Sequence, residues 1–117
     1  MHVGFLQVKP GPTEAEFQEV CKEIQGRMEG YPGCKTTFKR REGINAKGNQ
    51  YVYLQCVERG ENGKEVFVGT SVTWSKEKRL VVQVILEGVP KMQSQAGRAS
   101  EMRVLEKSAE DILLSLD

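Results

Sequence analysis

The sequence predicts an α+β fold built on a mostly antiparallel sheet, with the element order β-α-β-β-β-β-α. Residues 50–87 hold three consecutive strand-like runs, QYVYLQCVE, KEVFVGTSVTW and RLVVQVILE, separated only by turn residues. Two stretches outside this central meander, residues 13–29 and about 95–116, repeat apolar side chains at helical spacing. We expect residues 1–117 to form a single α+β domain, since a chain of this length can bury a core of its own.

The first predicted elements are a short strand and a capped helix. Residues 2–9 alternate in the manner of a strand, which a Pro-Gly-Pro run at 10–12 ends. Thr13 and Glu16 have the spacing of a capping box, in which each side chain satisfies a free backbone N–H of the other residue. The helix predicted over 13–29 carries an apolar stripe made of Phe17, Val20, Cys21, Ile24 and Met28.

The segments on either side of the meander are predicted from their composition. Residues 34–40 (CKTTFKR) are typical of a strand with Cys34 facing inward, and residues 41–49 of a flexible basic loop with two glycines. A Gly-Val-Pro run at 88–90 ends the sheet, because proline cannot continue a central ladder. We expect the long C-terminal helix to lie over the small residues Gly69 and Ser71.

The register of the first hairpin decides which side chains share a face of the sheet. Asn62-Gly63 favours a two-residue type I′ turn, which would place Tyr53 opposite Val72 and Tyr51 opposite Trp74. A one-residue slip would exchange the faces. In the predicted register neither face alternates apolar with charged residues, so neither is typical of a solvent-exposed face.

One predicted face gathers aromatic and polar side chains that together favour an interface or a binding groove. The predicted partner- or ligand-binding residues are Tyr51, Tyr53, Gln55, Thr70, Val72, Trp74 and Gln83. Gln55, Thr70 and Gln83 form a polar row across this face, and a buried core rarely keeps unpaired glutamine amides. The alternative is that the first helix covers this face and that the row is a satisfied buried network.

A basic cluster is a second candidate site. Its members are Lys35, Lys39, Arg40, Arg41 and Lys47. Beside the tyrosines, such a cluster could contact an anion or single-stranded nucleic acid. The alternative is a solvated edge strand, whose lysines block aggregation. The formal net charge of +1 favours this alternative and disfavours nucleic acid.

Catalytic and metal sites find no support in the residues. The three cysteines include no CxxC pair, and His2 is the single histidine, so neither a cysteine nucleophile with its base nor a zinc site is indicated. We expect three reduced thiols, with Cys34 the most accessible. That expectation favours the cytoplasm, with a processed secreted form left open. No cofactor motif is present, and no apolar run is long enough to cross a membrane.

These observations predict a domain that works by binding rather than by catalysis. The first hypothesis is a protein-interaction or self-associating module, most simply a homodimer, that uses the apolar and aromatic sheet face. The alternative is a pocket for a small apolar molecule between the sheet and the C-terminal helix, with the polar row orienting the ligand. A single-stranded nucleic-acid binder is the second alternative, and an enzyme comes last.

Overall fold

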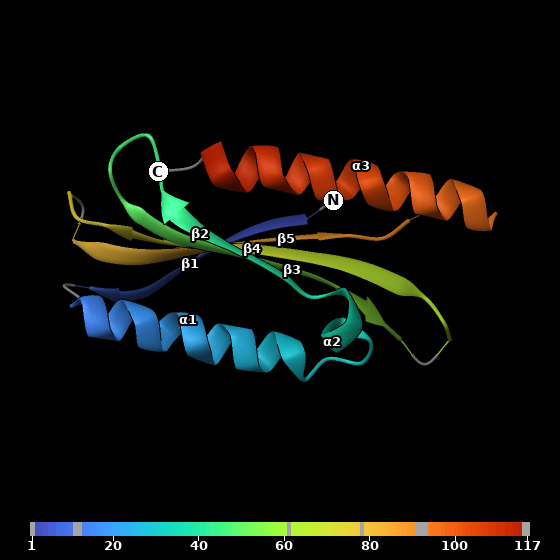
Figure 1. Cartoon of the computed structure of the whole chain (residues 1–117), viewed down its shortest axis with the longest axis horizontal. Coiled ribbons are helices and arrows are strands. Elements are labelled where there is room, and N and C mark those ends of the chain that lie inside the picture. The colour runs from blue at the N-terminus through green and yellow to red at the C-terminus, as the bar shows by residue number, and fades with distance from the viewer. Residues whose placement is uncertain (1, 11–12, 61, 78, 91–93, 116–117) are drawn as a thin grey trace.

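An antiparallel sheet lies between two long helices on its opposite faces (Figure 1). The computed structural model describes residues 2–10, 13–60, 62–77, 79–90 and 94–115. Within these ranges the elements are β1 His2–Pro10, α1 Glu14–Glu29, α2 Cys34–Thr37, β2 Lys39–Ile44, β3 Gln50–Arg59, β4 Glu65–Ser75, β5 Leu80–Gly88 and α3 Gln95–Ser115. The strand order is β1-β5-β4-β3-β2, and every neighbouring pair is antiparallel. The predicted fold class is confirmed, with one short helix added.

Helix α1 forms where the capping pattern and the apolar stripe predict it. The Glu16 backbone N–H donates to Thr13 Oγ1 and the Thr13 backbone N–H donates to Glu16 Oε1, both over 3.3 Å. The buried positions of α1 are Phe17, Cys21, Ile24 and Met28, four of the five residues predicted for its stripe. The helix therefore packs on the sheet along this stripe and exposes its charged side.

The sheet separates two hydrophobic cores. Helix α1 (blue in Figure 1) covers one face, and α3 (red) covers the opposite face. Beneath α1, its apolar stripe meets Val52, Leu54, Cys56, Val68, Val72 and Val81. Beneath α3, the core is formed by Tyr53, Phe67, Val84, Leu86 and Ala109, with Met102 and Leu105 packed against it. Both faces of the sheet are therefore interior. This explains why neither face shows the alternation of apolar and charged residues that is typical of a solvent-exposed face.

The predicted register of β3 against β4 is wrong by one residue. Tyr53 lies opposite Ser71. The hairpin closes where the Gly60 N–H donates to the Lys64 carbonyl over 2.8 Å, and Gly63 takes a left-handed φ of 71°. A three-residue connection with a left-handed glycine at its end thus replaces the two-residue type I′ turn. The slip moves every β3 side chain to the other face relative to β4.

The predictions for residues 34–49 need two corrections. Residues 34–37 form the short helix α2 rather than a strand, and it begins after Gly33, whose φ is 83°. The next strand, β2, starts at Lys39 and occupies part of the stretch predicted as a loop. Helix α2 is fixed to β3, where the Val57 N–H donates to Thr37 Oγ1 over 2.8 Å. Threonines that are typical of a strand here serve as local hydrogen-bonding groups.

The prediction of three reduced thiols is wrong as well. Cys34 and Cys56 form a disulfide, with their Cα atoms 5.1 Å apart. Cys34 is fully buried rather than accessible, because α2 lays it on the inner face of β3. Cys21 is the one free cysteine and is also buried. Cysteine spacing along the chain does not reveal such a pairing, since the partners meet only after α2 folds onto the sheet.

Candidate functional site

The residues predicted to form one binding surface lie on two opposite faces of the sheet. Tyr51 and Tyr53 belong to the core beneath α3, with Gln55 on the same side of β3. Val72 and Trp74 belong to the core beneath α1. The slip in the β3–β4 register is the reason for this division. The predicted row of Gln55, Thr70 and Gln83 is therefore broken at its first member.

Most of these side chains are buried. The smallest exposed fractions belong to Val72 with 0%, and to Tyr53 and Thr70 with 2% each. Trp74 is half-buried, and the Phe17 ring of α1 stacks on it. The alternative in which the first helix covers the face that carries Trp74 is thus the one that the structure shows. Among the residues whose burial the structure describes, neither sheet face is left as an open aromatic surface.

The polar groups on the α1 side form a hydrogen-bonded pair. Gln83 Nε2 donates to Thr70 Oγ1 over 3.1 Å, and Thr70 Oγ1 donates to the Val84 carbonyl over 3.0 Å. Both side chains are at most 5% exposed. They line a cavity of about 150 Å³ between the second half of α1 and the sheet. Part of the predicted polar row therefore faces a real cavity, although under α1 rather than under α3.

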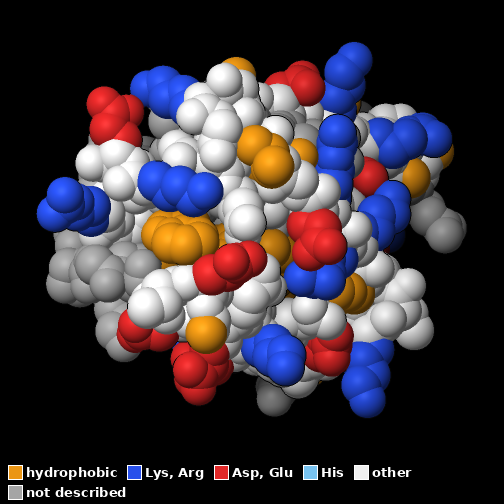
Figure 2. Space-filling model, turned by 60° about the vertical axis from the view of Figure 1, so that its left-hand side comes forward, with side chains coloured by type: hydrophobic (Ala, Val, Ile, Leu, Met, Phe, Trp, Pro, Cys, Tyr) orange, Lys and Arg blue, Asp and Glu red, His pale blue; other side chains and the backbone are white. Residues whose placement is uncertain are grey.

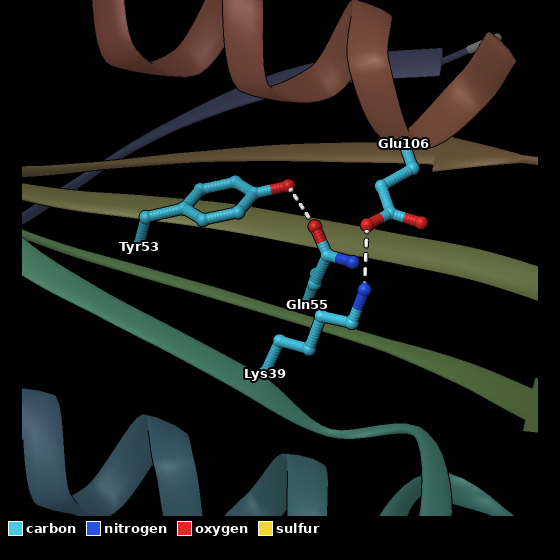
Figure 3. A network of polar contacts seen from close by, with 4 residues as sticks. All are labelled: Lys39, Tyr53, Gln55 and Glu106. Atoms are coloured by element: carbon cyan, nitrogen blue, oxygen red, sulfur yellow. Dashed lines mark hydrogen bonds and ion pairs between the residues drawn. The ribbon is translucent and has the colours of Figure 1, made fainter. Parts of the chain in front are cut away.

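The polar groups on the α3 side form a network that joins three elements (Figure 3). Tyr53 Oη donates to Gln55 Oε1 over 2.7 Å, and Lys39 Nζ pairs with Glu106 Oε1 over 2.8 Å. The hydrogen bond from Lys39, assisted by one from Gln55, holds the pKa of Glu106 below its ordinary value. The network connects β2 and β3 to α3.

The free thiol of Cys21 lies in surroundings that do not activate it as a nucleophile. Burial raises the pKa of the Cys21 thiol to about 11, and the Arg40 charge only partly opposes this. The thiol is therefore protonated near neutral pH, and a protonated thiol is a poor nucleophile. Over the described part of the chain, no group of three or more His, Cys, Asp or Glu side chains is placed to hold a metal ion.

The five basic residues predicted to contact an anion do not line one path. Lys39, Arg40 and Arg41 are consecutive on β2, so their side chains alternate between the two faces of the sheet. Lys35 lies on α2 and Lys47 in the turn after β2. Arg40 pairs with Glu42 over 3.1 Å. The arrangement matches the charged edge strand that was the alternative for this cluster, because β2 is the last strand of the sheet.

A groove runs between this edge strand and α1. Two hollows of about 260 and 300 Å³ follow one side of α1, and both include Gln18. The first is lined by Glu14, Phe17, Gln18, Glu42, Gly43, Ile44, Gln50, Tyr51 and Val52. The second is lined by Gln18, Cys21, Lys22, Gln25, Gly26, Glu29 and Arg40. The helix side of the groove thus carries mixed charge, with an apolar site at the end near Phe17 and Ile44.

Ile44 is the apolar residue most open to solvent along this groove, with 69% of its surface exposed. Figure 2, in which the left side of Figure 1 comes forward, shows hydrophobic side chains as small separate patches between charged ones. The described side chains in this view therefore form no broad apolar face, and a partner that binds them must satisfy charges as well as cover apolar atoms.

The groove is the feature that sequence reasoning missed. Residues 41–49 were expected to be a loop. No strand edge was therefore predicted there, and nothing indicated that Lys39–Ile44 would lie beside α1. One signal was available, since Ile44 is an isolated apolar residue within a basic and glycine-rich stretch. A single exposed apolar residue is common on protein surfaces, so this signal alone does not predict a partner.

Comparison with known proteins does not assign the chain to a family. No protein-family model matches the chain, and neither a curated protein nor a solved structure is significantly similar to it. None of the helices in the described ranges combines the length and the apolar character that crossing a membrane requires.

Proposed function

We propose that this protein is a non-catalytic interaction domain that binds an extended segment of a partner protein along the open edge of β2. The observation that supports this most is the groove between β2 and α1 at the end of the sheet. An extended peptide that adds a strand to a sheet edge gains backbone hydrogen bonds, and the neighbouring hollows can select its side chains.

Because α1 and α3 cover the two faces of the sheet, we place the binding site at its β2 edge. Neither face of the sheet is open to a protein partner over its middle, because α1 lies over one face and α3 over the other. All of the β2 side chains except Gly43 are exposed. An edge strand of this kind presents backbone N–H and C=O groups that a further strand can pair with.

Charge on β2 indicates the chemistry of the partner segment. The strand holds Lys39, Arg40 and Arg41 against Glu42, an excess of two positive charges (3 − 1 = 2). Positive side chains at an edge repel basic strands and attract acidic ones, so the charges that protect this edge also make it selective. We therefore propose an acidic extended segment with one apolar residue placed beside Ile44.

A second copy of the chain is the less favoured occupant. If two β2 strands paired antiparallel about a two-fold axis through Arg41, Arg40 would face Glu42 of the second copy. The same pairing puts Arg41 directly opposite Arg41, and like charges in that position are destabilising. A homodimer through β2 thus gains two ion pairs but repels at its centre, whereas an acidic partner could pair with Arg40 and Arg41 and would meet one like charge on the strand, Glu42.

Selection from a peptide library tests the proposal directly. Random eight-residue peptides displayed on phage are selected on the immobilised protein, and the affinities of the enriched peptides are then measured for variants. We expect enriched peptides to be acidic, with one apolar position, and to bind Arg41→Glu at least about tenfold more weakly, which is about 1.4 kcal/mol. The matched control is Lys64→Glu at the β3–β4 hairpin, which makes the same charge change away from the β2 edge and should leave affinity unchanged.

Two outcomes would overturn the proposal. One is a set of enriched peptides without an acidic bias whose binding ignores Arg41→Glu. The other is a dimer in sedimentation of the chain alone that Arg41→Glu dissociates, because this result would assign the β2 edge to a second copy. A monomer in the absence of peptide is the expected result.

The disulfide bears on the compartment. A buried disulfide such as Cys34–Cys56 is typical of proteins that fold where conditions are oxidising. We therefore propose an oxidising compartment in preference to the cytoplasm, which was the first expectation from the cysteine count. Chain produced in an oxidising compartment should alkylate at one cysteine per molecule when denatured without reductant, whereas three alkylated cysteines would contradict the proposal.

A further inference from the structure

The cavity beside α1 lies on the side of this helix that faces away from the β2 groove, so it is a separate site. It is lined by Ile24, Arg27, Met28, Tyr31, Glu58, Val68, Thr70, Gln83, Ile85 and Glu87. Its volume of about 150 Å³ equals that of an engineered apolar cavity in another protein that binds benzene. The space therefore suits a compact molecule with roughly the bulk of one six-membered ring.

The buried part of this cavity's lining combines apolar side chains with two polar ones, Thr70 and Gln83. Ile24, Met28 and Val68 are each less than 8% exposed. Gln83 is 5% exposed, and the hydrogen bond that its side chain makes within the described residues comes from Nε2, which donates to Thr70. Gln83 lines the cavity, and its amide oxygen has the capacity to accept a further hydrogen bond. A ligand that donates a hydrogen bond would use this capacity.

The mouth of the cavity sets the charge of the ligand. Glu58 and Glu87 line it together with Arg27, so the surrounding side chains sum to one negative charge (1 − 2 = −1). Tyr31 lines the same cavity and adds an aromatic surface. A carboxylate ligand would be repelled by this balance, whereas a neutral or monocationic head group would not.

We infer that this cavity binds a small molecule composed of a compact apolar body and one hydrogen-bond-donating head, an alcohol or a primary amine. The apolar body packs against the α1 stripe, and the head group donates to Gln83. This site is independent of the β2 edge, so its occupancy does not require the proposed partner segment.

Four ring compounds of nearly equal size test this inference: benzyl alcohol, benzylamine, toluene and benzoate. Each is titrated into the full chain while amide chemical shifts are followed. Benzyl alcohol and benzylamine should shift the Thr70 and Gln83 amides in a saturable way and bind at least about fivefold more tightly than toluene. Benzoate should bind more weakly than toluene. Equal binding of toluene and benzyl alcohol, preferred binding of benzoate, or no shift at these amides would overturn the inference.

Two variants separate the role of each group. Gln83→Met keeps most of the side-chain volume and removes the amide, so it should abolish the preference for benzyl alcohol over toluene. Thr70 Oγ1 still donates to the Val84 carbonyl in that variant, which favours folding. The variant Glu58→Gln/Glu87→Gln keeps the size of these two lining side chains and removes their negative charges, so it should weaken benzylamine relative to benzyl alcohol. A ligand ranking that neither variant changes would contradict the assigned site.

Discussion

The Phe17 ring of α1 stacks on the Trp74 ring of β4, with ring centroids 6.0 Å apart and planes inclined by 27°. Lys76 Nζ lies 5.6 Å from the centroid of the same indole. This pair of rings fixes α1 to the sheet face that would otherwise be the best candidate for an exposed aromatic surface. The position of one phenylalanine therefore decides whether Trp74 serves an interface or the core.

Phe17→Ala should lower the free energy of unfolding by about 3–5 kcal/mol, because it removes a large, fully buried ring and leaves a cavity. Denaturant unfolding followed by the fluorescence of Trp74 measures the change. The control Gln18→Ala, at an exposed neighbouring position, should stay within about 0.5 kcal/mol of wild type. A loss below about 1 kcal/mol for Phe17→Ala would mean that α1 does not pack as described.

Ser71→Ala should raise the free energy of unfolding by about 1 kcal/mol. Ser71 is 1% exposed, and within the described structure its Oγ is buried without a hydrogen-bond partner. Removing an unsatisfied hydroxyl removes its desolvation cost. Thr70→Ala is the comparison, since the Thr70 hydroxyl is bonded and its loss should be destabilising. If Ser71→Ala destabilised the protein as much as Thr70→Ala does, the hydroxyl of Ser71 would have to be bonded.

Loss of the disulfide in Cys34→Ser/Cys56→Ser should cost about 2–4 kcal/mol, because the bond closes a loop between residues 22 positions apart. Thermal unfolding with and without reductant gives the same comparison on the unmodified chain. Cys21→Ala is the control. This variant keeps the disulfide, so reductant should lower its melting temperature by the same amount as in wild type. Identical melting of wild type in both conditions would contradict the disulfide.

The Lys39–Glu106 pair should make stability depend on pH in the acid range. The pKa of Glu106 is lowered in the folded protein, chiefly by the hydrogen bond from Lys39, so the folded state holds the proton less tightly than the unfolded state. Its contribution is therefore present above the ordinary pKa of about 4.5 and is lost as pH falls through the folded value.

Glu106→Gln should remove this part of the acid dependence and cost less than about 1 kcal/mol at pH 7, since Glu106 is one-third exposed. Urea unfolding at a series of pH values checks it. Glu77→Gln, in the exposed β4–β5 turn, should leave the slope as in wild type. An unchanged acid slope in Glu106→Gln would contradict the assignment.

Gly88→Ala should destabilise the fold by up to about 1 kcal/mol, because the end of the flexible Leu105 side chain must move aside. A Cβ at position 88 would lie 2.5 Å from Leu105 Cδ2, because α3 approaches the end of β5 closely there. In a Leu105→Ala background the same change should cost clearly less, so a double-mutant cycle reports the contact. Additive effects of the two changes would place α3 elsewhere.

Sequence periodicity was sufficient for elements whose signals are local. The capping box and apolar stripe of α1, the extent of α3 and the three meander strands are local patterns, and each appears within about a residue of its predicted bounds. The failures involve turn geometry and long-range contact. Asn62-Gly63 suits a type I′ turn, but the chain uses Gly63 alone in the left-handed conformation, and this choice depends on the twist of the whole hairpin.

The candidate site could be predicted only in part for the same reason. Tyr53 and Trp74 were predicted to share one binding face, but the one-residue slip puts them on opposite faces. Thr70 and Gln83 were correctly placed on one face and do share a hydrogen bond. The β2 edge and its groove depend on α2 turning the chain after Gly33, and a four-residue helix is too short to give a periodic signal.

Amide hydrogen exchange of β2, with and without a selected acidic peptide, tests the proposed strand addition most directly. A partner strand pairs with outward-facing backbone groups, so alternate amides within Lys39–Ile44 should exchange at least about tenfold more slowly when the peptide is bound, as expected for newly paired groups. Amides of α3 should be unchanged. Protection along α3 or beneath α1, with β2 exchanging as in the free protein, would show that the partner binds elsewhere and would contradict the account.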